Sequence, residues 1–505
     1  MPDIFANLAQ AFADFGNWTT LVALVAGLVL GIVIGVLPGL GPLAGISLAI
    51  PFTFYMTPTD GMALLIGIYH GGSYGGALTA CLIGIPGTPI AAATTLDGYP
   101  MTLNGQPSEA ATLATISSVF GGVLGSIALI LVAQPLAGFA MRIGPPELFA
   151  LALLGLTTLA SVTEGSFLKS AIAGIVGLGL ATVGNDPLTG YARFDFGLQS
   201  LQGGFDLIVI LMGIFSIAEL MILAEGNFSI PRLTTGVSVS WPAIRMFFRK
   251  LPGAFRASAI GVSVGAVPGV GAVTSAYLAY SVARNSSNDP ESFGKGNPDG
   301  VIATEAANSA TVGGALLPML AIGIPGEPIA AALMAGLLIH GLTPGPLLFA
   351  TNPEFVAGIF LAILIGAVLL LPVAFLALPV VLSVLKLPKS GLVAGIFLLS
   401  STGVFALASQ VADLWAMMGF GVLGYLMRKF GFPASPLVLG LVLGPIFESN
   451  LRRTVLLAGN DPLTYFVGRP ITLAVFALCL LALAWNIRSA IRGRNAGRDF
   501  GPVGK

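Results

Sequence analysis

The sequence predicts an all-α polytopic membrane protein with two inverted structural repeats and discontinuous or re-entrant helical hairpins. Its 505 residues are 55% hydrophobic and only 9% charged, with a mean hydropathy of +0.94. A soluble domain carries about 25% charged residues, so lipid must cover most of this chain. Three motifs rich in glycine, proline or aspartate occur twice, once in each half.

The apolar stretches predict the number of helices. A spanning helix needs about 20 predominantly apolar residues, and division of the apolar regions by that length predicts about 11 to 13 helices together with partial ones. The clearest stretches are residues 19–36, 110–133, 149–161, 205–223, 355–378, 391–407 and 471–485.

The basic residues predict the orientation. Residues 1–141 contain no Lys or Arg, whereas basic residues gather in 231–256 and in the tail 488–505. By the positive-inside rule, we expect this connection and the C-terminal tail to be cytoplasmic and the N-terminus periplasmic. The N-terminus lacks the basic region of a cleaved signal peptide, so its first helix is expected to remain in the mature protein.

We therefore predict a first membrane repeat over 1–230 and a second over 257–487. Only the second repeat is preceded by a basic cluster. The two repeats are then expected to enter the membrane from opposite faces, which is the signature of inverted repeats.

The first motif is expected to break a helix. Residues 35–41 read GVLPGLG, and about 230 residues later 265–271 read GAVPGVG. Proline removes a backbone donor and glycine tolerates unusual conformations, so the helix is interrupted. In lipid such a break persists only inside protein or beside water. Its carbonyl groups suit a cation such as Na⁺, and the resuming helix suits a carboxylate; a simple kink at a helix crossing is the alternative.

The second motif predicts a helix, a tight turn and a second helix. Residues 84–93 read GIPGTPIAAA and residues 323–332 read GIPGEPIAAA. A polar residue followed by proline is a standard helix start, so each copy is expected to form the tip of a re-entrant hairpin. Glu327 replaces Thr88, and an intramembrane carboxylate is functional by default. Glu327 is expected to bind the coupling cation, accept a proton or cap the following helix.

Polar segments precede the second motif in both halves. They read HGGSYGG over 70–76 and NSATVGG over 308–314, and the alignment of their ends pairs Gly75 with Gly313. Hydroxyl, amide and bare backbone groups suit ion binding by dipoles, with close packing as the alternative. Glu305 is a second candidate carboxylate, and His70 is either a proton carrier or structural. His340 is expected to be structural.

The third motif, GNDPLT, occurs at 184–189 and 459–464 and indicates a structural corner through Asp186 and Asp461. Cys81 and Cys479 have no metal-ligand spacing, so neither a disulfide nor a zinc site is expected. No catalytic motif and no phosphate-binding loop is present, so neither enzyme activity nor a cofactor is predicted. The motifs carry no basic residue, which leaves Arg193 and Arg284 as reserve anion partners.

Together these motifs define the candidate substrate- and ion-binding residues, with no metal site beyond Na⁺ at the same motifs. They are Pro38, Gly39, Gly41, Ser73, Tyr74, Gly75, Gly87, Thr88, Pro268, Gly269, Gly271, Asn308, Thr311, Gly313, Gly326 and Glu327.

The repeated motifs resemble those of the large membrane (TctA-type) subunit of the tripartite tricarboxylate transporter family, from about residue 18 to about residue 487. The resemblance implies a multi-pass protein of the bacterial inner membrane. It implies two partners, a small four-helix membrane subunit and a periplasmic solute-binding protein. It also implies import of carboxylates such as citrate by symport with Na⁺ or H⁺, without fixing the substrate. Paired hairpins suggest an elevator mechanism.

Two other functions remain open from the sequence. One is the permease of an ATP-driven importer, with the basic connection docking a separate ATPase. The other is a channel or a structural membrane protein, which predicts neither saturable solute binding nor dependence on a counter-ion.

Overall fold

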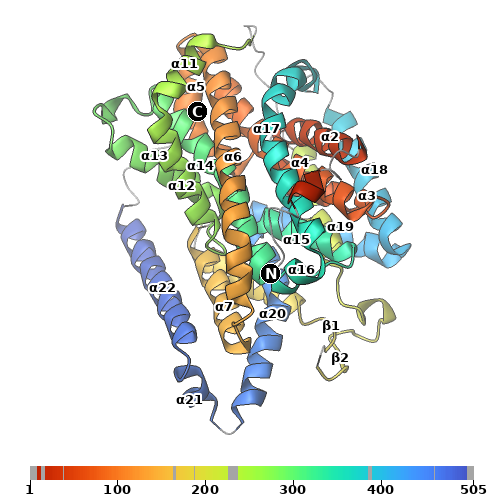
Figure 1. Ribbon diagram of the computed structural model, residues 1–505. Helices are drawn as coiled ribbons and strands as arrows, with labels where there is room; N and C mark the ends of the chain where they lie inside the picture. Colours follow the sequence, from red (N-terminus) through yellow and green to blue (C-terminus); the bar gives the residue numbers. More distant parts are fainter. Residues whose placement is uncertain are drawn as a thin grey trace. The chain divides into compact units, whose positions relative to one another are not determined.

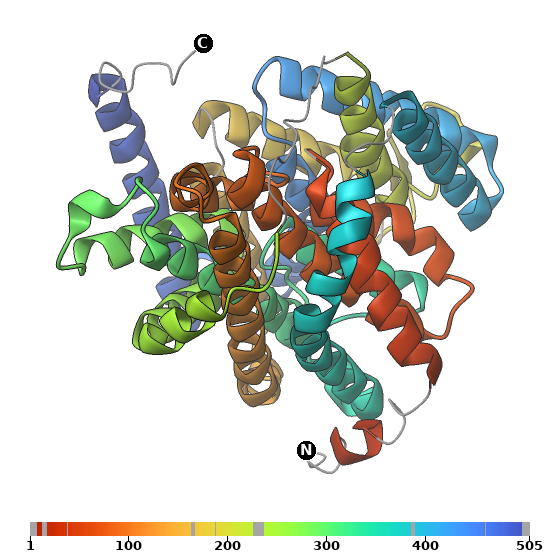
Figure 2. The same ribbon diagram turned by 90° about the horizontal axis from the view of Figure 1, so that it is seen from above.

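The computed structural model describes residues 8–12, 18–37, 39–162, 167–186, 188–225, 237–384, 389–459 and 461–496. These residues are overwhelmingly helical (Figures 1 and 2), and the sheet among them is a two-stranded ribbon of β1 (Gly184–Asn185) and β2 (Ala192–Arg193). Six described helices are long and apolar enough to cross a membrane, and five shorter apolar helices accompany them. The predicted class, an all-α polytopic membrane protein, is confirmed.

The chain forms two compact units, which are described separately. The first comprises residues 1–141 and 206–425, and the second comprises 142–205 and 426–505. Each unit takes segments from both halves of the sequence. The repeat boundaries expected from the sequence remain predictions.

The first unit holds all copies of the first two motifs. Its helices are α2 (Trp18–Val36), α3 (Gly41–Thr53), α4 (Pro58–Ile83), η1 (Pro89–Ala91), α5 (Ala92–Leu103), α6 (Pro107–Ala140), α9 (Leu207–Leu211), η3 (Met212–Ile217), α10 (Ala218–Glu225), α11 (Trp241–Arg249), α12 (Leu251–Gly265), α13 (Gly271–Asn285), η4 (Pro290–Ser292), α14 (Pro298–Ile322), α15 (Pro328–Ile339), α16 (Pro346–Thr351), α17 (Pro353–Val384), α18 (Lys389–Ala408) and most of α19 (Val411–Lys429).

In the first half, α2 and α3 form a helical hairpin. Thr20, near the start of α2, donates a hydrogen bond of 2.5 Å to Asp60 in the first turn of α4. The end of α3 is joined to α4 by a short turn, so α3 returns to the side from which α2 started. The tip of this hairpin is the first motif.

In the second half, α12 and α13 form the corresponding hairpin and lie side by side (Figure 1). Lys250, just before α12, forms an ion pair of 2.6 Å with Asp299 in the first turn of α14. The loop after α13 leads directly into α14. Both ends of this hairpin therefore lie near the start of α14, and its tip is the second copy of the first motif.

The second motif returns the chain into the protein after a long helix. Helix α4 has 26 residues, about 39 Å at 1.5 Å per residue. After it, the amide of Gly87 bonds back to the Gly76 carbonyl at 3.4 Å, and the amide of Gly326 bonds to the Ala315 carbonyl at 3.3 Å after α14. The predicted helix–turn–helix is thus present in both halves.

Helices α4 and α14 run in opposite directions. Asn104, after α5, donates a hydrogen bond of 3.2 Å to the Lys295 carbonyl before α14. At the other end, His340 after α15 packs over Gly61 in the first turns of α4. Thr102 of α5 donates a hydrogen bond of 2.8 Å to the Cys81 carbonyl near the end of α4, so this end of α4 lies beside the start of α14.

Small residues hold the helices together. Gly27, Gly31 and Gly35 of α2 lie at intervals of four against the backbone of α4, leaving no room for a Cβ atom. Gly261 and Gly265 of α12 meet α14 in the same way. Because lipid supplies no hydrophobic force between helices, such close backbone contact is the usual basis of their association. It encloses α4 and α14 in protein, so polar residues are tolerated along both.

We expect Gly261→Ala to lower the unfolding temperature of the purified protein clearly. The added methyl group would overlap the Ala307 carbonyl oxygen of α14, and overpacking of this kind costs about 1–3 kcal/mol. Gly253 of the same helix has open space around it, so Gly253→Ala should be neutral or slightly stabilising. Equal unfolding temperatures for the two variants would contradict the packing described here.

The second unit contains α7 (Pro145–Val162), α8 (Phe167–Leu180), the β ribbon, η2 (Gln199–Leu201), α20 (Ala434–Ala458), α21 (Pro462–Val467) and α22 (Pro470–Ala496). Gly177 of α8 and Gly440 of α20 bring these two helices into backbone contact. A carboxylate cluster with arginine side chains, described below, ties the ribbon to α20.

Candidate functional site at the hairpin tips

The tips of the two motifs meet in both halves through the same backbone hydrogen bond. The Gly39 amide donates to the Gly87 carbonyl at 3.1 Å, and the Gly269 amide donates to the Gly326 carbonyl at 2.8 Å. Gly39 and Gly269 have φ of 88° and 86°, a conformation that L side chains rarely adopt. In each half, a glycine of the first motif is therefore hydrogen-bonded to a glycine of the second motif: Gly39 to Gly87, and Gly269 to Gly326.

The neighbouring positions explain why these motifs need glycine. Gly41 and Gly271, at the start of α3 and α13, also have positive φ, 54° and 70°. A Cβ atom on Gly87 would overlap the Gly35 carbonyl oxygen. Pro38 lies outside the described residues, whereas Pro268 is buried at its tip.

Thr88 and Glu327 occupy matching positions but have different partners. The Thr88 hydroxyl accepts from the Ala91 amide at 3.3 Å and caps its own helix. Glu327 does not cap α15; its Oε2 accepts from the Ala272 amide at 2.9 Å, and its Oε1 accepts from the Tyr69 hydroxyl. This geometry rules out one expected role, the capping of the following helix: Glu327 instead caps α13.

Glu327 joins the two halves of the first unit. It lies in the second half, and Tyr69 lies on α4 in the first half. Its carboxylate also faces the N-terminus of α13, where the helix dipole favours negative charge. Since the side chain is only 3% exposed, this carboxylate is held by two donors in a region that excludes bulk water.

A second buried carboxylate lies at the other tip. Glu219 of α10 is 4% exposed, and its carboxylate occupies the space that a Cβ atom on Gly39 would need. It follows the π-helical segment η3, a rare form of helix that often occurs at functional sites. Both first-motif tips thus have a carboxylate against their backbone.

The polar segments before the second motif serve several roles. Gly75 meets the Ile32 carbonyl of α2, and Gly314 meets the Val262 carbonyl of α12. Gly314 therefore corresponds to Gly75, and the alignment of Gly75 with Gly313 was wrong by one residue. Sequence alone did not resolve the register because both halves contain a Gly-Gly pair. Gly313 instead packs against Gly125 of α6.

Other predicted residues face helix interfaces rather than a tip. The Tyr74 hydroxyl shares a hydrogen bond of 2.8 Å with Thr115 of α6. Thr311 bonds to Ser275 of α13 at 2.7 Å and to the Gly261 carbonyl at 3.2 Å. Ser73 is buried and its hydroxyl has no hydrogen-bond partner among the described residues.

Asn308 lies one turn after Glu305 on α14, with its side chain beside the Glu305 carboxylate, which accepts from Thr94 of α5 and Ser118 of α6. His70 packs beside Gly122 of α6 and Gly366 of α17. Neither His70 nor His340 forms a described hydrogen bond with the Glu327 carboxylate.

The reserve arginines are not at the tips. Arg193 belongs to the second unit, where it pairs with Glu448 at 2.6 Å. Arg284 lies in the last turn of α13, the end opposite Gly271. Within the described ranges, no ion pair involves Glu305 or Glu327.

Sequence reasoning missed several of these residues. Glu219 could have been found by the rule that singled out Glu327, since it is a carboxylate within an apolar span. Tyr69, Thr94 and Ser118 carried no such signal, because their importance comes from segments that are distant in the sequence.

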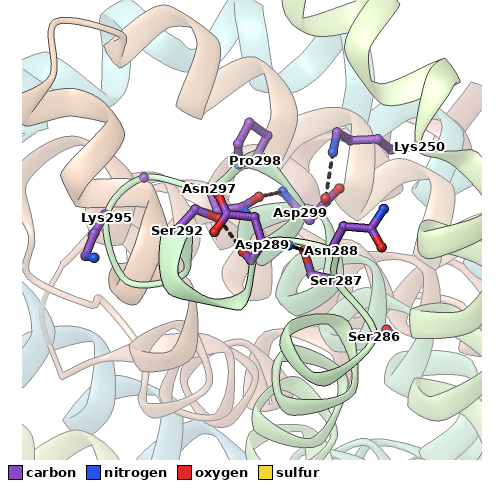
Figure 3. Close-up of a pocket in the computed structure, with 11 residues that line it drawn as sticks. Lys250, Ser286, Ser287, Asn288, Asp289, Ser292, Lys295, Asn297, Pro298 and Asp299 are labelled. Carbon is purple, nitrogen blue, oxygen red and sulfur yellow. Dashed lines mark hydrogen bonds and ion pairs between the residues drawn. The ribbon is translucent and has the colours of Figure 1, made fainter.

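An open polar pocket of about 740 Å³ lies elsewhere in the first unit. Figure 3 shows it between Lys250 and the loop from Ser286 to Asp299, with the Lys250–Asp299 ion pair at its side. The loop is anchored by Asp97, whose Oδ1 accepts from the amides of Gly294, Gly296 and Asn297 at 2.8–2.9 Å. The pocket is separate from the tips and shares no residue with the motifs.

In both copies of the third motif the aspartate side chain accepts from the backbone amide three residues later; the first copy lies in the β ribbon and the second begins α21. Oδ1 of Asp186 accepts from the Thr189 amide at 3.0 Å, and Oδ1 of Asp461 accepts from the Thr464 amide at 3.2 Å. Asp186 also pairs with Arg452 at 2.6 Å. These contacts match the predicted structural corner; residues 187 and 460 lie outside the described residues.

The pKa of Asp186 lies below the usual value, because the Leu188 amide and then Arg452 stabilise its charged form. The sign follows from linkage: a lowered folded pKa contributes stability above the unfolded pKa of about 4, and this is lost as pH falls toward the folded pKa. Asp186→Asn should therefore lower the unfolding temperature near pH 7, and the difference from wild type should shrink below about pH 4. Asp195→Asn in the same loop is the control, because no described ion pair holds Asp195. A difference for Asp186→Asn that grows on acidification would contradict the assignment.

Comparison with known proteins identifies the family of this chain. A model of the tripartite tricarboxylate transporter TctA family matches residues 21–439. The chain belongs to the tripartite tricarboxylate transporter TctA family. Membership implies the large subunit of such a transporter, a multi-pass membrane protein that works with further components. The family resemblance expected from the motifs is confirmed.

Two relatives of this TctA-family chain come from Agrobacterium vitis. One, an uncharacterized 52.8 kDa protein in the TAR-I ttuC' 3' region, is 34% identical over 497 residues, which cover 98% of each chain. The other, an uncharacterized protein in the TAR-II ttuC' 3' region, is 33% identical over 237 residues, 46% of this chain and 96% of that protein.

Proposed function

We propose that this TctA-family chain imports organic carboxylates by symport with Na⁺ or H⁺, as the large membrane subunit of a binding-protein-dependent transporter in a bacterial inner membrane. The single observation that carries the proposal, beyond the family, is the matched pair of tips: Gly39 with Gly87 and Gly269 with Gly326. Broken helices in the two halves of a transporter, with their ends meeting inside the protein, are where such proteins bind substrate and ions.

The charges at the tips support a coupling cation. Glu219 and Glu327 are buried beside the tip backbone, and a region that already holds carboxylates attracts cations. No Lys or Arg lies in the four segments of the first two motifs. A carboxylate substrate would then depend on amide groups, helix N-termini and co-bound cations for charge compensation.

The opposite courses of α4 and α14, together with the matching tip hydrogen bonds, support an inverted repeat. We propose that the paired hairpins move as a body in an elevator-type cycle. Cysteines introduced one at a time at Ile85 and at Val267, which lie in the motifs of the two halves and are respectively partly exposed and exposed, should then gain and lose reactivity toward a membrane-impermeant thiol reagent together, as Na⁺ and substrate are added. Independent changes at the two positions would refute movement as one body.

Uptake into proteoliposomes tests the function itself. The vesicles would contain this chain, a small membrane subunit and a solute-binding protein, with radiolabelled citrate or another carboxylate outside and an imposed inward Na⁺ or H⁺ gradient. Uptake that requires both the gradient and the binding protein is expected. Uptake that persists without any ion gradient but requires ATP would refute the proposal.

A further inference from the structure

A buried cluster of oxygen atoms lies between α5, α6 and α14, outside the tip contacts described above. Its centre is Glu305 of α14, which is fully buried. One carboxylate oxygen accepts from the Thr94 hydroxyl, and the other accepts from the Ser118 hydroxyl at 2.9 Å. Thr94 also lies 3.1 Å from the Thr304 hydroxyl.

Asn308 completes the cluster. It lies one helical turn after Glu305, is 1% exposed, and its amide lies beside the Glu305 carboxylate. Neither amide atom has a hydrogen bond of standard geometry in the described residues. A buried amide whose hydrogen bonds are poorly aligned costs free energy. A ligand held by the Glu305 carboxylate and the Asn308 amide together would improve the contacts of both side chains.

The charge of the cluster points to what is bound. Glu305 has hydroxyl and amide neighbours but no basic side chain in any described ion pair. A carboxylate without a counter-charge is costly inside a membrane protein. A single bound monovalent cation would balance the charge.

The ligand atoms favour a hard cation. The side chains of Thr94, Ser118, Thr304, Glu305 and Asn308 offer oxygen atoms from three helices, and hard cations prefer oxygen ligands. Gly121 and Gly125 of α6 bring that helix into backbone contact with Ala306 and Ala310 of α14. This close packing holds the oxygen atoms of α6 and α14 near one another around Glu305.

We propose that Glu305, Thr94, Ser118 and Asn308 form a Na⁺ site that is distinct from the Glu327 contacts. In its role as a coupling site, this inference rests on the proposed function, because Na⁺ bound between α5, α6 and α14 would link the helix after the first-half tip to the helix before the second-half tip. The binding itself requires neither substrate nor partner subunits.

The test measures ²²Na⁺ binding and unfolding temperature of the purified full-length chain in nanodiscs, with K⁺ or choline replacing Na⁺ at constant ionic strength. Na⁺, but not K⁺ or choline, should raise the unfolding temperature in proportion to the logarithm of its concentration, as for any ligand that binds the folded state. Glu305→Gln should weaken Na⁺ binding at least tenfold.

Two neighbouring serines supply a matched pair of variants. Ser118→Ala removes a hydroxyl that contacts Glu305 and should weaken Na⁺ binding several-fold. Ser117 is equally buried on the same helix but contacts no member of the cluster through a described hydrogen bond. Ser117→Ala should leave the affinity within twofold of wild type. This pair keeps the test decisive if Glu305→Gln does not fold.

Three outcomes would overturn the site: no Na⁺-specific binding by the wild type, equal affinities for the Ser117 and Ser118 variants, or stability that responds to pH but not to Na⁺. The last would indicate a proton on Glu305 instead. Na⁺ binding with the expected variant pattern, but no carboxylate uptake in proteoliposomes, would leave this site established and refute only the proposed transport function.

Discussion

Replacement of Glu327 with glutamine is expected to reduce gradient-driven carboxylate uptake by about 10- to 100-fold. The variant keeps the size of the side chain but removes the charge that faces the N-terminus of α13 and that accepts from Ala272 and Tyr69. Hydrogen bonds to charged groups contribute about 1.5–3 kcal/mol, and 1.4 kcal/mol corresponds to a factor of ten. The measurement is the initial rate of uptake in proteoliposomes at several substrate and Na⁺ concentrations.

Two further variants separate a specific role from a general effect of charge. Glu354→Gln, at an exposed position in the first turn of α17, should leave uptake unchanged. Tyr69→Phe removes one donor to Glu327 and should have a smaller effect than Glu327→Gln. Wild-type uptake by the Glu327→Gln protein would exclude this carboxylate from binding and coupling.

Replacement of Gly87 with alanine is expected to abolish uptake. The added Cβ atom would overlap the Gly35 carbonyl oxygen at the point where the two first-half motifs meet. Relief of this overlap requires the Gly39–Gly87 hydrogen bond to open, and the tip would then lose the geometry shared with the second half. Gly326→Ala should act in the same way through the Gly265 carbonyl.

The control for these glycines is Gly395→Ala in α18, where a Cβ atom meets nothing within 4 Å. It should retain uptake and unfold at or slightly above the wild-type temperature. Size-exclusion profiles of the Gly87 and Gly326 variants distinguish an inactive folded protein from an unfolded one. Wild-type uptake by the Gly87→Ala protein would contradict the tight approach of these two motifs.

The sequence predicted the local structure of the motifs best where a backbone conformation demanded a residue type. The positive φ of Gly39, Gly41, Gly269 and Gly271 admits few residues other than glycine, so these positions were visible in the motifs. The helix start at Thr88 was also visible, because a side-chain cap followed by proline is a local signal. The third motif was interpreted correctly as a corner because its hydrogen bonds are also local.

The prediction failed where partners come from distant segments. The register between 70–76 and 308–314 was off by one because two adjacent glycines give no unique alignment, and only the backbone contacts of Gly75 and Gly314 resolve it. Of the three roles expected for Glu327, the capping of its own helix was wrong, because its carboxylate accepts from Ala272 and Tyr69 and makes no cap hydrogen bond to α15. Glu219 was overlooked although the rule for intramembrane carboxylates covers it.

By itself the sequence determined the membrane class, the positions of the helix breaks and the family, since composition and glycine–proline motifs act through local backbone chemistry and the cost of burying polar groups in lipid. Only the tertiary structure decided which breaks meet, which helix Glu327 caps, and which hydroxyl groups surround Glu305. These contacts join residues that are up to 258 positions apart. Their selection depends on how small residues allow helices to approach one another, and that is a property of the packed helices rather than of any single segment.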